Sequence, residues 1–208
     1  MIDATRKEFG LGKKEKYDFR YCGREIAQDK DTFEVTVTCR DSAAKLEPIR
    51  LDAKRSKMLL DALTAGETEE LRSKVGQLMW LCRIAQPSVA CRTSKLQSVM
   101  NKGVVEDILT CNKTLAYAKE HKNDGFHFKP GVVDWSVPGG SVMLTIADAS
   151  HANEFEFVDV TQELEPYRTQ GGRITALASP GVISTSSTSV KRVTRATVQG
   201  ETYNLQSG

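Results

Sequence analysis

The sequence predicts an α+β fold in which a β-hairpin and three helices are followed by a second, strand-rich region. Three observations predict it. Polar and apolar side chains alternate between residues 19 and 39, apolar residues recur every three or four positions between residues 64 and 122, and strand-like segments return after residue 142. The chain has 208 residues, of which 39% are apolar and 27% charged, so it has the composition of a globular protein that can bury a core.

The first ordered element is expected to be a β-hairpin. Residues 19–26 and 32–39 are rich in β-branched and aromatic side chains, and the polar residues 28–31 connect them. A short helix begins at residues 41–45 and ends near Pro48. Residues 1–18 are polar and lack a core-forming pattern, so they are interpreted as a flexible tail.

Three amphipathic helices are expected next. Thr64 can cap the first, and Glu67, three residues later, would complete a capping box. Pro87 ends this helix, a second covers residues 89–100, and a third runs from residue 105 towards Gly125.

Two residues of these helices admit more than one interpretation. Trp80 falls near the edge of the apolar stripe, and packing is favoured over base stacking. Asn112 falls on the inner side of the third helix and is interpreted as a polar core residue with its hydrogen bonds satisfied.

The periodicity changes after a linker rich in proline and glycine at residues 130–140, and the domain boundary is placed there. Residues 142–147 are expected to form a strand that ends at Asp148, and residues 171–177 a second strand. A third strand begins at residue 182, and the hydroxyl-rich residues 184–189 form either a flexible loop or a weak strand. A helix would begin near Thr194.

The charges and cysteines restrict the class of protein. Residues 1–130 hold 24 Lys and Arg against 19 Asp and Glu, whereas residues 131–208 hold 5 against 8. The first part could therefore follow a phosphate backbone while the second collects carboxylates. Five cysteines without metal-binding spacing argue against a disulfide framework or a zinc site. No apolar run approaches a membrane span and no signal peptide is visible, so an intracellular location, in the cytoplasm or the nucleus, is expected.

The order of several motifs resembles the Pol polyprotein of copia-type retrotransposons. Phe19-Arg-Tyr-Cys-Gly-Arg-Glu-Ile26 resembles the strand after the palm of the reverse transcriptase, and Leu71-Arg-Ser-Lys-Val-Gly-Gln-Leu-Met-Trp-Leu81 with Gln86-Pro87 resembles the following pair of helices. Ala147-Asp-Ala-Ser150, Gln170-Gly-Gly172 and residues 192–201 are similar to the start of the attached ribonuclease H domain. Each motif is loose, and their shared order makes the resemblance.

The resemblance implies a domain assignment and a metal site. Residues 19–130 would be the thumb-like C-terminal region of the polymerase, and residues 131–208 a truncated ribonuclease H-like α/β domain. Asp148 matches the first catalytic, metal-binding aspartate and Glu201 the helix glutamate. In that family, two Mg²⁺ ions on such carboxylates cleave the RNA strand of an RNA–DNA hybrid. Lys191, Arg192 and Arg195 would contact the phosphates of the hybrid.

Several departures from the family pattern indicate an incomplete enzyme. The Tyr-x-Asp-Asp motif of the polymerase is absent, and the remaining aspartates of ribonuclease H should lie beyond Glu201. The family often has a tryptophan near Ile183 and an alanine at the position of Gly200. We therefore expect a segment that acts with the rest of the polyprotein and has little nuclease activity alone.

Two alternatives remain open from the sequence. The chain could be a non-catalytic remnant that binds an RNA–DNA hybrid or a single strand through its basic first part. It could also be an unrelated α/β interaction domain, in which Asp148 and Glu201 are surface acids that lie far apart.

Overall fold

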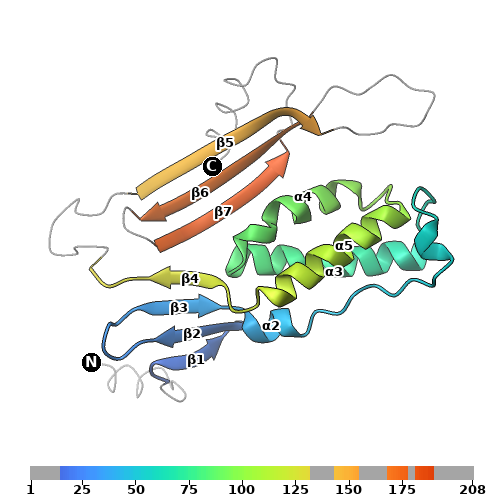
Figure 1. Ribbon diagram of the computed structural model, residues 1–208. Helices are drawn as coiled ribbons and strands as arrows, with labels where there is room; N and C mark the ends of the chain where they lie inside the picture. The colour runs from blue at the N-terminus through green and yellow to red at the C-terminus, as the bar shows by residue number, and fades with distance from the viewer. Residues whose placement is uncertain (1–14, 132–142, 155–167, 178–180, 190–208) are drawn as a thin grey trace, which may run out of the picture.

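The structure, a computed structural model, describes residues 15–131, 143–154, 168–177 and 181–189. These residues form a mixed α+β fold with two antiparallel sheets and a group of helices (Figure 1). The predicted α+β class is confirmed at this level. The predicted domain boundary borders residues 132–142, which lie outside the described residues.

The first sheet has four strands in the order β1-β2-β3-β4, all antiparallel. They are β1 Asp18–Tyr21, β2 Arg24–Gln28, β3 Val35–Thr38 and β4 Gly125–Phe128. The predicted strand over residues 19–26 is wrong, because the chain turns back within it. Cys22 and Gly23 have φ angles of 49° and 77°, which produce a two-residue turn between β1 and β2. Since β1 starts at Asp18, the predicted tail is also one residue too long.

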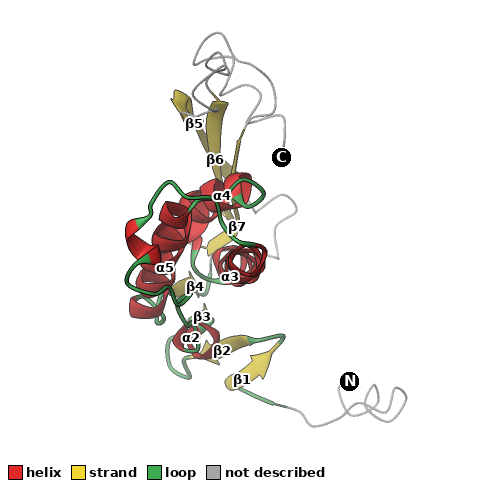
Figure 2. Ribbon diagram, turned by 90° about the vertical axis from the view of Figure 1, so that its right-hand side faces the viewer, coloured by secondary structure: helices red, strands yellow, loops and turns green. Residues whose placement is uncertain are grey.

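The helices form the centre of the described chain (Figure 2). They are α2 Arg40–Ala44, η1 Arg55–Lys57, α3 Ala65–Ile84, η2 Pro87–Val89, α4 Ala90–Val99 and α5 Val105–Glu120. The three long helices appear where the periodicity predicts them. Their inner faces bury one apolar cluster, whose largest members are Leu71, Leu78, Leu81, Leu96 and Ile108. Burial of such side chains contributes about 1.5–3 kcal/mol each, so this cluster is the main source of stability.

Polar side chains fix the start of α3 and the segment that follows α2. Thr64 caps α3 in the predicted capping box, because its hydroxyl accepts from Glu67 N while the Glu67 carboxylate accepts from Thr64 N. Asn112 has the satisfied hydrogen bonds that were predicted: its side chain accepts from Ile49 N at 2.8 Å and donates to Ile49 O at 2.9 Å. The segment after α2 is thereby attached to α5.

The second sheet has three antiparallel strands in the order β5-β6-β7. They are β5 Met143–Glu154, β6 Arg168–Leu177 and β7 Gly181–Ser189. β5 runs past Asp148 instead of ending there, and the hydroxyl-rich residues 184–189 belong to β7 and not to a loop. β7 lies beside α4, α3 and β4, so it connects this sheet to the rest of the described chain (Figure 1).

Candidate functional site

Asp148 lies inside β5 and is paired with Gly172 of β6. Gly172 is in turn paired with Ser187 of β7. Its side chain is exposed, whereas the next residue, Ala149, is 4% exposed and points to the other face. Glycine brings no side chain to the position opposite Asp148. The carboxylate therefore stands on an open face of the sheet with room on the β6 side.

The same face carries apolar side chains. Leu144 and Ile146 precede Asp148 at two-residue steps, and Ile174 is the cross-strand partner of Ile146. Their exposures of 51%, 59% and 46% are high for large apolar residues on a sheet. The carboxylate thus borders an apolar surface that a further segment could cover.

The other predicted site residues cannot be placed next to Asp148. Glu201, Lys191, Arg192 and Arg195 all lie outside the described residues. Within residues 15–131 and the three described strands of the second sheet, no group of three or more His, Cys, Asp or Glu side chains gathers as a metal site. Mg²⁺ prefers oxygen ligands, so the carboxylate of Asp148 has the chemistry of one ligand of the expected metal. Of the two predicted ligands, the described residues include Asp148 alone.

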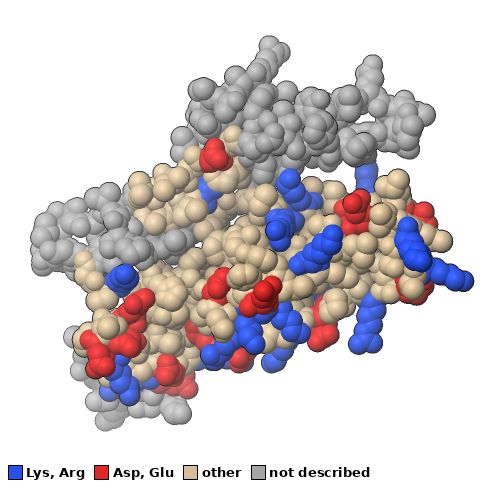
Figure 3. All heavy atoms as spheres, viewed as in Figure 1, with Lys and Arg blue, Asp and Glu red and all other residues tan. Residues whose placement is uncertain are grey.

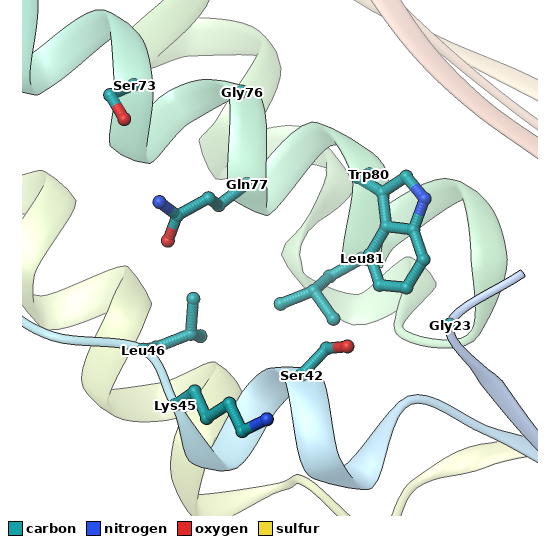
Figure 4. Close-up of a pocket in the computed structure, with 9 residues that line it drawn as sticks. All are labelled: Gly23, Ser42, Lys45, Leu46, Ser73, Gly76, Gln77, Trp80 and Leu81. Carbon is teal, nitrogen blue, oxygen red and sulfur yellow. The ribbon is translucent and has the colours of Figure 1, made fainter.

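A second candidate site is a cleft between α2 and α3 with a volume of about 670 Å³ (Figure 4). α3 supplies one wall, the α2 segment the other, and the β1–β2 turn closes one end. The lining residues are Gly23, Ser42, Lys45, Leu46, Ser73, Gly76, Gln77, Trp80 and Leu81. Leu46 and Leu81 are buried and belong to the core, so the bottom of the cleft is apolar and rigid.

Trp80 and Gly76 shape the α3 wall of this cleft. Trp80 is 36% exposed, and a Cβ added to Gly23 would lie 3.0 Å from its ring. The β1–β2 turn therefore supports one edge of the indole. Gly76 lies one helical turn before Trp80, and a Cβ added there would meet nothing within 4 Å. An internal helix glycine costs about 1 kcal/mol relative to alanine, and no contact among the described residues requires this one.

The cleft is a site that the sequence analysis did not identify. Trp80 was predicted to pack, and its ring does lie against Gly23, but it is also 36% exposed and forms part of the wall of the cleft. The signal that could have found it is Gly76, because a glycine in the middle of a well-capped helix has no local reason to be there.

The charges are not arranged as one basic track on the face in Figure 3. Lys and Arg side chains are interspersed with Asp and Glu over this face of the molecule. The excess of Lys and Arg in residues 1–130 therefore does not form one basic surface on this face, and binding of an anion would depend on individual basic residues. No helix of the described residues is both long and apolar enough to cross a bilayer.

Comparisons of the chain with protein-family models, with curated proteins and with solved structures found no match.

Proposed function

We propose that this chain is a segment of a retrotransposon Pol polyprotein, an RNA-directed DNA polymerase with a ribonuclease H domain, and that it acts on RNA–DNA hybrids. The observation that carries the proposal is the position of Asp148. It stands on the open face of the first of three consecutive antiparallel strands, and these strands follow a group of three helices. This order of elements is the one that the resembling motifs imply.

The exposed apolar side chains beside Asp148 support a convergence of the two carboxylates. A segment that covered Leu144, Ile146 and Ile174 would come to lie next to Asp148, because all four side chains share one face. The residues after β7 include Val193 and Ala196, which are three positions apart and would share one face of the expected helix. Glu201 belongs to the same stretch and would then approach Asp148.

The chemistry of the site follows from its ligands. A bound Mg²⁺ would supply activated water and stabilise the leaving oxygen in hydrolysis of a phosphodiester. Asp148 would hold the ion from the sheet and Glu201 from the covering segment. Metal affinity falls with fewer ligands, and two carboxylates are a small set. We therefore expect magnesium to strengthen binding of a hybrid while the segment alone cleaves it slowly or not at all.

The test is a binding and cleavage assay on a fluorescently labelled RNA–DNA hybrid, with and without Mg²⁺. We expect salt-dependent binding that Mg²⁺ strengthens in the native chain and not in Asp148→Asn. Glu156→Gln, which changes another acidic residue of the second region, should respond to Mg²⁺ like the native chain. Equal binding of hybrid and duplex DNA, with no effect of Asp148→Asn, would contradict the proposal.

A second candidate is a nucleic-acid-binding remnant without catalysis, in which the positive balance of residues 1–130 would act through separate basic sites and not through one basic surface. It predicts hybrid or single-strand binding that does not depend on Mg²⁺ or on Asp148. An unrelated protein-interaction domain would bind neither nucleic acid at low salt, so the same assay separates all three.

A further inference from the structure

We propose that the cleft between α2 and α3 binds one strand of a nucleic acid, with a backbone phosphate at Lys45 and a sugar or base against Trp80. The inference depends on the proposed function for the class of ligand only. The binding site that it assigns includes neither Asp148 nor any residue of the second sheet.

The charge of the cleft indicates an anionic ligand. Lys45 is the one charged residue among those that line it, and no carboxylate faces it there. Within the part of the chain that the structure describes, Lys45 makes no ion pair, whereas Arg55 pairs with Glu67 and Lys119 with Glu47. An unpaired ammonium on the wall of a cleft is available to a phosphate.

The opposite wall suits a flat or apolar group. Trp80 exposes part of its ring to the cleft, and the β1–β2 turn supports the far edge of that ring at Gly23 (Figure 4). A supported indole loses little freedom when a ligand stacks on it. Aromatic faces bind bases of any sequence, because every base has a π face.

Gly76 gives an independent reason to expect a ligand. Its missing side chain leaves the space between Ser73, Gln77 and Trp80 open, and no residue that the structure describes fills that space. A glycine lowers helix stability, and at Gly76, unlike Gly66, the open position faces the cleft, so a group in the cleft can approach the α3 backbone there. A strand that lies along α3 would use this space, with Gln77 and Ser73 as hydrogen-bonding groups.

The single cation favours a strand over a free nucleotide. Each phosphodiester of a strand carries one negative charge, which Lys45 can match. The terminal phosphate of a free nucleotide carries close to two negative charges at neutral pH, and the lining residues offer no second cation or helix N-terminus for them. The cleft is also accessible at both Lys45 and Trp80, so a chain can enter and leave it.

The experiment uses a pair of glycines in the same helix. A leucine at Gly76 projects into the cleft, whereas a leucine at Gly66 near the start of α3 adds the same side chain at a position that also meets nothing within 4 Å. Binding of a fluorescein-labelled 12-nucleotide single strand is measured by anisotropy at low salt without Mg²⁺. We expect Gly76→Leu to weaken binding about tenfold or more and Gly66→Leu to leave it unchanged. Thermal melting should show both variants folded.

Two further variants test the roles of the walls. Trp80→Leu should weaken binding about as much as Gly76→Leu. Lys45→Gln should reduce the slope of log K against log salt by about 0.7. Lys113→Gln, at an exposed position of α5, is the control for loss of one surface charge.

The outcomes separate this inference from the proposed function. If the native chain binds the strand and Gly76→Leu binds it equally well, the cleft is not the site, and the Mg²⁺ effect at Asp148 still decides the proposed function. If adenosine monophosphate competes with the strand at equal nucleotide concentration, the cleft binds free nucleotides and the strand assignment is wrong. If the native chain binds no single strand at low salt, the cleft proposal is overturned, and the hybrid assay with Mg²⁺ still decides the proposed function.

Discussion

Arg55 holds both carboxylate oxygens of Glu67, with Nε to Oε1 at 2.9 Å and Nη2 to Oε2 at 2.8 Å. The same guanidinium reaches Asp61 and the carbonyl of Ala62. Glu67 also accepts from Thr64 N, so one carboxylate both caps α3 and anchors the loop before it. This loop carries the exposed apolar residues Met58, Leu59 and Leu60, and the ion pair holds it in place.

The first prediction concerns acid stability. The hydrogen bonds from Arg55 lower the pKa of Glu67 from 4.5 to about 2. A lowered carboxyl pKa stabilises the folded state above the ordinary pKa, and the contribution is lost as the pH falls from 4.5 towards 2. We expect Glu67→Gln to lower the melting temperature by roughly 3–6 °C at pH 7, with a difference that shrinks below pH 4. Thermal melts across this range test it, with the exposed Glu69→Gln as control. A difference independent of pH would contradict the assignment.

The second prediction concerns Asn112. Alanine at this position leaves the backbone N–H and C=O of Ile49 without their partners, and Ile49 is 4% exposed. Loss of these hydrogen bonds should cost about 2–3 kcal/mol. Urea unfolding measures it. Asn112→Asp keeps the acceptor for Ile49 N and loses the donor, so its stability should fall between those of the native chain and the alanine variant. An alanine variant as stable as the native chain would show that water replaces the side chain.

The third prediction concerns the β1–β2 turn. Gly23→Ala combines a strained φ of +77° with a contact of 3.0 Å to the ring of Trp80. Gly131 has the same φ and nothing within 4 Å of an added Cβ, so Gly131→Ala measures the backbone cost alone, which is about 1 kcal/mol. We expect Gly23→Ala to be less stable than Gly131→Ala and to shift the emission of Trp80 in a Trp135→Phe background. Equal behaviour of the two variants would mean that the ring moves aside freely.

The fourth prediction concerns the thiols. Burial raises the pKa of Cys39 to about 11 and that of Cys111 to about 12, and it also raises the pKa of Cys82. Cys22 and Cys91 are exposed. A disulfide reagent at pH 8 should therefore modify two thiols rapidly and all five only after unfolding. Rapid reaction of all five in the native buffer would show that the helical core opens readily.

The sequence predicted elements whose local signals agree with their packing. The capping box at Thr64 and Glu67 and the three helical stripes depend on spacing within one element, and these appear as expected. The error over residues 19–26 has a local cause. Alternation continues through Cys22 and Gly23, so only the glycine signals the turn. Residues 184–189, for which a loop or a weak strand was predicted, have little apolar content, and pairing with β6 makes them a strand.

The candidate sites also differ in whether spacing within the sequence could predict them. Asp148 was proposed as a site residue from its place in an ordered set of motifs, and the structure places it exposed on β5, where its role in metal binding stays a prediction. Its meeting with Glu201 stays a prediction, since Glu201 lies outside the described residues. The cleft could not be read from spacing, because α2 and α3 supply its walls from segments about 30 positions apart.

The pairing of β3 with β4 has a consequence for how the molecule is made. Val35 and Phe128 are partners, and all the helices that the structure describes lie between them along the chain. During synthesis, this edge of β3 stays unpaired until the ribosome has passed Phe128, because β4 is the strand that pairs with it and no earlier strand among the described residues does so. A fragment that ends at Asp124 would keep every described helix and still expose this edge. It should therefore aggregate under conditions in which a fragment that ends after Phe128 stays in solution.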